Sequence, residues 1–198
     1  MSKWAVIYSS VTGNTKRIAE AIAEQAEADI FRVQDAPKDV SGYDVVALGY
    51  WLRLGQPDPL MLQYLPKVHG TRVLFFQTHG TAPTSEHAIT SFARAGYVLG
   101  DGNEVLGTFG CRGKINPAMK KKREKSARTD PNDPHTGPKS EARWKLASTH
   151  PDAADIEAAK EFVENMKHKI ATRERYLAAK AAKMKAAAEA AASRKAES

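Results

Sequence analysis

Short apolar runs alternate with amphipathic segments along the first 170 residues. The β-branched and aromatic run at 4–8 predicts a strand, and apolar residues at helical spacing from 16 to 28 predict a helix. The same pattern predicts further strands at 30–33, 43–50, 71–77 and 104–109, and helices at 58–68, 84–96 and 152–166. We therefore expect an α/β protein with a doubly wound, five-stranded parallel sheet and helices on both faces.

This architecture also predicts where a ligand binds. In an open parallel sheet, ligands lie at the carboxyl ends of the strands, where the winding of the chain reverses. The loops after the first, third and fourth strands are therefore the expected positions of a site.

The chain divides into one domain and a tail. We expect a domain at 1–170, interrupted by a long basic loop insertion at 112–150 that contains the run Lys120-Lys-Lys-Arg123 and a segment rich in Pro, Asp and Gly from 130 to 138. Residues 171–198 are dominated by Ala and Lys and lack a large apolar stripe, which predicts a solvated helix that frays at its end.

The positive charge is concentrated in two places. The chain carries a net charge of +7, but residues 1–111 carry −2, whereas residues 112–145 carry +7 and residues 166–198 carry +6. A binding module for acidic partners is thus one reading of the insertion and the tail. Nucleic acid is not expected as a partner, because Tyr176 is the only aromatic residue of the tail and base stacking has little support.

Other features exclude several classes of protein. The single cysteine, Cys111, rules out an intrachain disulfide and a multi-cysteine metal site. The first residues lack the pattern of a signal peptide, and no apolar run reaches the roughly 20 residues of a spanning helix. We expect a cytoplasmic protein with no membrane span and no metal.

The first predicted strand leads into a loop of small and hydroxyl-bearing residues before a helix. This placement directs main-chain N–H groups and hydroxyls at one point, where a phosphate fits. The motifs of P-loop nucleotide-binding proteins and of dinucleotide-binding folds are both absent, so an uncharged cradle for a monophosphate is the expected site. Its residues are Ser9, Ser10, Val11, Thr12, Gly13, Asn14 and Thr15.

The stretch from Ser10 to Thr15 resembles the FMN-phosphate loop of the flavodoxin family, and the resemblance extends over residues 3–168. It implies FMN as the cofactor and the strand order 2-1-3-4-5, with FMN at the switch point; flavodoxin is the standard example of that order.

The resemblance also implies contacts with the flavin ring from three further segments. After the third strand come Tyr50, Trp51 and Leu52, of which Trp51 is expected to stack on the ring; a core aromatic is the alternative, with Tyr50 as the inward neighbour. After the fourth strand come Thr78, His79 and Gly80, where His79 is either a titrating neighbour of the flavin or an exposed loop histidine. Cys111 and Arg112 follow the fifth strand on the same rim, although Cys111 also fits a small buried residue.

The expected function is electron transfer. The resemblance implies an FMN-binding carrier that takes electrons from a reductase and passes them to an acceptor enzyme, with no catalytic side chain of its own. The alternative is an FMN-dependent NAD(P)H oxidoreductase that acts on quinones or a similar acceptor. Ordinary flavodoxins resemble acidic carriers, so the basic insertion and tail imply a different kind of redox partner protein.

Overall fold

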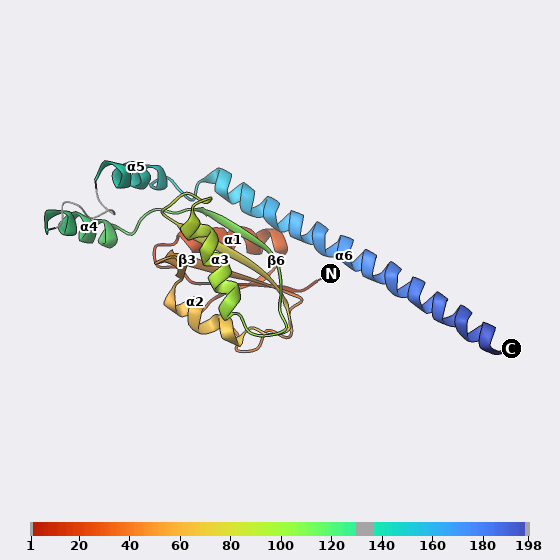
Figure 1. Cartoon of the computed structure of the whole chain (residues 1–198). Helices are drawn as coiled ribbons and strands as arrows, with labels where there is room; N and C mark the ends of the chain where they lie inside the picture. Colours follow the sequence, from red (N-terminus) through yellow and green to blue (C-terminus); the bar gives the residue numbers. More distant parts are fainter. Residues whose placement is uncertain (1, 130–136, 197–198) are drawn as a thin grey trace.

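The computed structural model describes residues 2–129 and 137–196, and the side chains of 2–126 and 137–187. A twisted sheet forms the centre, and helices cover both of its faces (Figure 1). The elements in chain order are β1 (Trp4–Tyr8), α1 (Asn14–Ala26), β2 (Asp29–Arg32), β3 (Val45–Arg53), β4 (Gln56–Pro57), α2 (Pro59–Tyr64), the 3₁₀ turn η1 (Leu65–Lys67), β5 (Arg72–His79), α3 (Glu86–Val98), β6 (Glu104–Arg112), α4 (Pro117–Thr129), α5 (Pro138–Ala147) and α6 (Ala153–Ala196).

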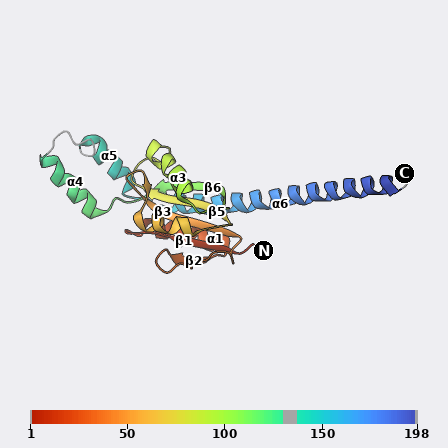
Figure 2. The same cartoon turned by 60° about the horizontal axis from the view of Figure 1, so that its bottom comes forward.

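The five long strands are parallel and lie in the order β2-β1-β3-β5-β6 (Figure 2). Counted among the parallel strands alone, this is the predicted order 2-1-3-4-5, which is confirmed. The two-residue strand β4 was not predicted; it pairs antiparallel with the end of β3, where Leu52 lies opposite Pro57.

Each face of the sheet has its own hydrophobic core. On one face, α1 and α6 pack their apolar residues, Ile18, Ile22 and Val163 among them, against the strands. On the other face, α2, η1 and α3 do the same, with Met61 and Leu65 fully buried. The predicted helices on both faces are thereby confirmed.

Three strands run further at their carboxyl ends than the apolar pattern predicts, and one of them, β5, reaches His79 instead of residue 77. Strand β3 continues to Arg53, because β4 supplies a hydrogen-bonding partner for its end. Strand β6 continues to Arg112, because its last residues pair with β5 as far as His79. The site residues that lie on strands, where loops were expected, are therefore Trp51, Leu52, Thr78, His79, Cys111 and Arg112.

The insertion is largely helical, which differs from the expected loop. Helix α4 follows Asn116, whose side-chain Oδ1 accepts from the Ala118 amide at 2.9 Å. Pro117 occupies the first helical position, which suits its fixed φ, and lysine and arginine are good helix formers. Residues 130–136, predicted as turns, lie outside the described residues.

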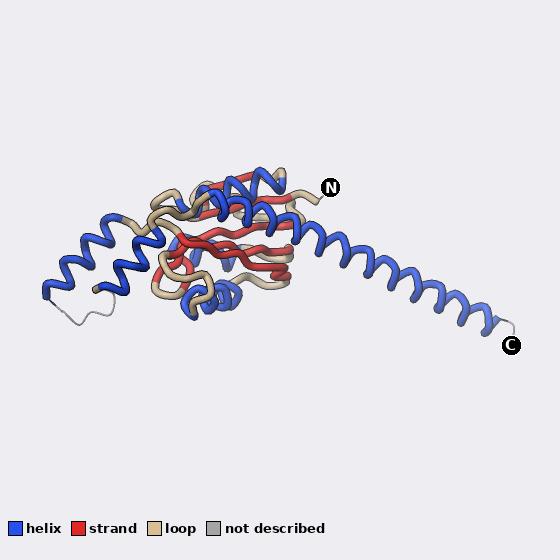
Figure 3. The backbone as a smooth tube through the Cα atoms, turned by 90° about the horizontal axis from the view of Figure 1, so that it is seen from above, coloured by secondary structure: helices blue, strands red, loops and turns tan. Residues whose placement is uncertain are grey.

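The last helix joins the domain and the predicted tail into one element of 44 residues. Its inward residues recur every seven positions as Ile156, Val163 and Ile170. Beyond Ile170 every described side chain is exposed, and the helix projects past the edge of the sheet (Figure 3). No helix in the described ranges is both long and apolar enough to cross a membrane.

Candidate functional site

A pocket of about 170 Å³ opens at the carboxyl ends of the central strands. This is the end of the sheet at which a ligand was expected. The volume is below the range of about 300–1,000 Å³ that is common for small-molecule sites, so a larger ligand would extend out of it. The lining residues are Val11, Thr12, Asn14, Trp51, Leu52, Thr78, His79, Gly80, Gly113, Lys114, Ile115, Asn116 and Met119.

The loop before α1 is shaped for an anion. Gly13 is the N-cap of α1 with φ at 85°, a left-handed conformation that favours glycine. No side chain caps the helix, so its first-turn N–H groups remain available to a bound group. The Ser10 hydroxyl accepts from the Gly13 amide at 3.1 Å and fixes the turn.

Two of the predicted hydroxyls are occupied inside the protein. Ser9 is buried and donates to Asp58 Oδ1 at 2.8 Å, and its amide donates to the Gly49 carbonyl. The hydroxyls of Thr15 and Thr78 share a hydrogen bond of 2.8 Å, and both side chains are buried. Ser9 and Thr15 therefore position the loop, whereas Thr12 lines the pocket.

Asp58 is a buried residue that the sequence reasoning missed. It caps α2 by accepting from the amides of Leu60 and Met61 at 3.1 and 3.4 Å. Burial raises the pKa of Asp58, although the Ser9 hydroxyl acts in the opposite direction. An aspartate followed by proline is a recognisable start of a helix, but its link to Ser9, 49 residues away, is visible only in the folded chain.

The third-strand aromatics point in different directions. Trp51 and Leu52 line the pocket and are partly exposed. Tyr50 is fully buried in the core beside α3, where the Ser91 hydroxyl donates to its oxygen at 3.3 Å and Phe92 meets its ring edge-on. Burial raises the pKa of Tyr50, which keeps its hydroxyl protonated. The structure thus places Trp51, and not Tyr50, at the pocket.

His79 is neither exposed nor in a loop, which corrects one of the two expectations for it. It ends strand β5 with 5% of its surface exposed, and its Nδ1 lies 3.2 Å from the Thr81 carbonyl oxygen. Burial, with a smaller effect from Arg112, lowers the pKa of His79 to about 4. The ring is neutral at pH 7, so Nδ1 carries the proton toward Thr81 and the buried Nε2 has no partner among the described residues.

Cys111 and Arg112 do not line the pocket. Cys111 is buried on the face that α1 and α6 cover, and burial together with Asp155 and Asp152 raises the pKa of its thiol. A protonated thiol is a poor nucleophile, so no redox role follows. Arg112 lies opposite His79 in the sheet and is half-buried.

The segment after β6 forms a wall of the pocket that the sequence reasoning did not assign to the site. The Asn14 amide donates to the Lys114 carbonyl at 2.8 Å and to the Thr12 hydroxyl at 3.0 Å, which ties this segment to the phosphate loop. A Cβ on Gly80 would lie 1.9 Å from Cδ1 of Ile115, so the two segments touch only because residue 80 is a glycine. The sequence signal for this wall was the position of the segment directly after the fifth parallel strand.

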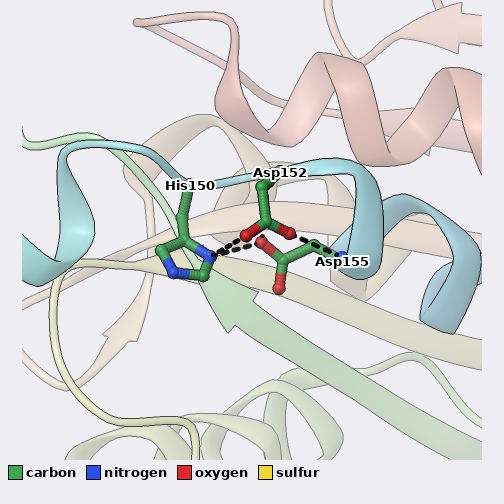
Figure 4. Close-up of side chains that lie close together, drawn as sticks. All are labelled: His150, Asp152 and Asp155. Carbon is green, nitrogen blue, oxygen red and sulfur yellow. Dashed lines mark hydrogen bonds and ion pairs between the residues drawn. The ribbon is translucent and has the colours of Figure 1, made fainter.

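Three potential ligands of a cation, His150, Asp152 and Asp155, cluster beside the start of α6 (Figure 4). Their oxygens already serve the helix: the Asp152 amide donates to Asp155 at 2.9 Å, and the Asp155 amide donates to Asp152 at 3.0 Å. This reciprocal pattern is a capping box, and His150 forms an ion pair with Asp155 when protonated. The cluster therefore stabilises the start of α6.

These features suit a ligand with a phosphate and a flat ring. The uncapped start of α1 and the Thr12 hydroxyl offer hydrogen-bond donors to a phosphate. Trp51, Leu52 and Ile115 offer apolar surface to a ring, and the glycine at 80 allows a main-chain approach to a ring edge.

The chain matches the flavodoxin domain family over residues 5–164. A similar relative is the flavodoxin-like domain-containing protein BilS of Clostridioides difficile strain CD3, which is 31% identical over 169 residues, covering 83% of this chain and 96% of that protein. An uncharacterized protein of Methanocaldococcus jannaschii, MJ0298, is 26% identical over 168 residues, covering 83% of this chain and 97% of that protein.

Solved structures share the fold. Oxidised flavodoxin 1 from Bacillus cereus superimposes with a TM-score of 0.53 at 14% identity, and the match covers 84% of this chain and 98% of that one.

Proposed function

Because the chain belongs to the flavodoxin family, its domain is an FMN-binding one, and we propose that it carries electrons between redox partner proteins. FMN supplies the redox chemistry, since a flavin exchanges one or two electrons. The protein supplies the binding, the orientation and the electrostatic surroundings of the ring.

The pocket residues take distinct roles in this proposal. The first-turn amides of α1 and the hydroxyls of Ser10 and Thr12 hold the phosphate. Trp51 packs against the flavin ring, and Leu52 and Ile115 exclude water from it. The Thr78–Gly80 segment offers main-chain groups to the ring edge.

One observation favours a carrier over an enzyme with its own substrate site. No carboxylate lines the pocket among the described residues, and its one imidazole, on His79, has a pKa near 4. The lining therefore offers neither a carboxylic acid nor a protonated imidazole at pH 7, and Lys114 is its one cationic side chain. Arg112, which was expected on the rim of the site, lies outside the lining. A cytoplasmic location stays a prediction from the sequence.

The proposal is tested by an absorbance spectrum of the full chain after FMN is added and the protein is desalted. We expect retained flavin that NADPH does not bleach under anaerobic conditions, with or without a quinone. Multiple turnovers of NADPH with quinone would instead establish the oxidoreductase. A spectrum without flavin would contradict the assignment of the phosphate loop.

A substitution locates the phosphate. Thr12→Asp places a carboxylate at the cradle and is expected to weaken FMN binding at least about tenfold, which corresponds to about 1.4 kcal/mol. Thr84→Asp adds the same charge at an exposed position outside the pocket lining and is the matched control. Equal dissociation constants for the two variants, measured by flavin fluorescence quenching, would place the phosphate elsewhere.

A further inference from the structure

Helices α4 and α5 form a projection beside the pocket, which we call the basic arm (residues 117–129 and 137–147). The arm extends from the end of the sheet that holds the pocket, away from the projecting end of α6 (Figure 1). Helix α4 contains six lysines and arginines and one glutamate within 13 residues. Lys120, Lys121, Lys122 and Lys125 are exposed.

The segments that lead into and out of the arm are fastened to the phosphate-loop helix. At its beginning, Asn14 of α1 holds the Lys114 carbonyl, and the Lys114 amide donates to the His150 carbonyl at 2.9 Å. At its end, Arg17 of α1 donates to the Pro151 carbonyl at 2.6 Å, directly before the capping box of α6 (Figure 4). The base of the arm is therefore fixed relative to the cofactor site.

The arm also contributes to the pocket itself. Met119 of α4 lines the pocket and keeps 46% of its surface exposed, directly before the lysine run. An apolar side chain at the pocket mouth bordered by cations is complementary to a protein surface with an apolar centre and an acidic rim.

The surface chemistry favours a protein over a nucleic acid. Helix α4, which carries the lysine run, contains no aromatic residue on which a base could stack, and the single aromatic residue of α5, Trp144, is partly buried. Its charge lies beside the pocket mouth, where a protein must approach to exchange electrons with a bound flavin.

We propose that the basic arm docks an acidic face of the redox partner and thereby holds the partner's redox centre over the pocket. This inference rests on the proposed electron-transfer function. Opposite charge raises the rate of encounter, and salt screens the attraction within about 8–10 Å at physiological ionic strength.

The test uses two small electron acceptors of opposite charge, the ferricyanide trianion and the hexaammineruthenium(III) trication. The full FMN-loaded chain is reduced anaerobically and mixed with either acceptor in a stopped-flow instrument over a range of ionic strength. We expect the rate with ferricyanide to fall about tenfold as salt is added and the rate with hexaammineruthenium(III) to rise.

Matched variants locate the charge. Replacing Lys121, Lys122 and Lys125 with Gln is expected to reduce the low-salt ferricyanide rate at least fivefold and to flatten its salt dependence. The same replacement at Lys180, Lys183 and Lys185 of α6 removes equal charge from the far end and is expected to leave the rate within twofold. FMN affinity, measured for each variant, is expected to stay at the wild-type value.

The outcomes separate the docking surface from the proposed function. Retained FMN with salt-independent rates, or equal rates for the two triple variants, would overturn the basic arm as a docking surface while leaving the carrier intact. Loss of FMN from the wild-type chain would overturn the carrier.

A ten-residue polyglutamate peptide and a dT oligonucleotide of equal charge are then compared as inhibitors of ferricyanide reduction. We expect the peptide to inhibit at least as strongly, whereas tenfold stronger inhibition by the oligonucleotide would overturn the proposal in favour of nucleic acid.

Discussion

Two lysine-rich helical extensions leave the sheet at opposite ends, and they are attached in different ways. The basic arm returns to the domain, and the residues that flank it on both sides, Lys114 and Pro151, are hydrogen-bonded to α1. The projecting end of α6 is held by the buried first half of the same helix and, near its start, by two ion pairs, Arg173–Glu104 and Glu174–Arg72. Similar composition therefore has different consequences, because only the arm can affect what approaches the cofactor.

The largest loss of stability is expected from a substitution where the projecting end of α6 is attached to the domain. Ile170 is the last buried residue among the described side chains of α6, so Ile170→Ala is expected to lower the free energy of unfolding by about 2–5 kcal/mol. Leu177→Ala, one heptad further along, removes a half-exposed side chain and is expected to cost less than about 0.5 kcal/mol. Urea unfolding of both variants measures the difference, and equal losses would show that the projecting end is itself packed.

At the carboxyl end of the sheet, where the basic arm begins, His79 is expected to make the free energy of unfolding depend on pH. Its folded pKa of about 4 lies below its ordinary value of 6.5, so the unfolded chain takes up a proton that the folded chain does not. The contribution of neutral His79 to the free energy of unfolding is complete above pH 6.5 and is lost as the pH falls to 4. At 1.36 kcal/mol for each pH unit, the loss is about 3 kcal/mol.

The measurement is the free energy of unfolding between pH 7 and pH 4 at a fixed FMN concentration. His79→Gln is expected to flatten the curve, whereas His168→Gln, at an exposed position of α6, keeps its wild-type slope. A wild-type slope in His79→Gln would remove His79 as the source of the dependence.

A smaller loss of stability is expected from Asn14, through which α1 is hydrogen-bonded to the phosphate loop and to the segment before the basic arm. Asn14→Ala removes the hydrogen bonds to Lys114 and Thr12, which frees the beginning of the arm and is expected to cost about 1 kcal/mol and to weaken FMN binding about fivefold. Gln25→Ala on the same helix removes a bond to Glu164 of α6 and is expected to leave FMN affinity unchanged. Titration with FMN compares the two variants, and equal affinities would separate the arm from the cofactor site.

The smallest effect is expected from an ion pair at the start of the projecting end. Arg72 and Glu174 lie 2.7 Å apart, but half of the Glu174 side-chain surface is exposed. Glu174→Gln is expected to reduce the free energy of unfolding by about 0.2–1 kcal/mol at low salt and by less at 1 M salt. Thermal unfolding at the two salt concentrations checks this, and a loss that persists at 1 M salt would contradict a screened surface pair.

The alternating pattern of the chain predicts most of the fold, and the resemblance to flavodoxins supplies the strand order. The ends of β3, β5 and β6 were missed for a physical reason. β3 is extended by pairing with β4, whereas the ends of β5 and β6 pair with each other as far as His79 and Arg112. Glycines 107 and 110 interrupt the apolar pattern of β6. The helical nature of α4 was available from Asn116 and Pro117, an N-cap followed by a favoured first residue.

The site was predicted less completely, because long-range pairing decides which polar groups are free. Ser9 and Thr15 look equivalent to Thr12 in the sequence, but their hydroxyls are paired with Asp58 and Thr78, 49 and 63 residues away. Likewise, no local sequence pattern shows that the Ile115 side chain packs against Gly80. Which segments meet at the pocket depends on the assembled sheet.

The seven-residue spacing of the inward positions of α6 fixes a direction as well as an attachment. Leu177 and Met184 continue the series of Ile156, Val163 and Ile170, and an α-helix drifts only about 20° per heptad from that repeat. They consequently face the side on which the helix meets the sheet. Because each residue turns the helix by about 100° and lengthens it by 1.5 Å, two residues inserted after Ile170 would rotate the projecting end by about 200°. Seven inserted residues would lengthen it by about 10 Å and almost preserve its orientation.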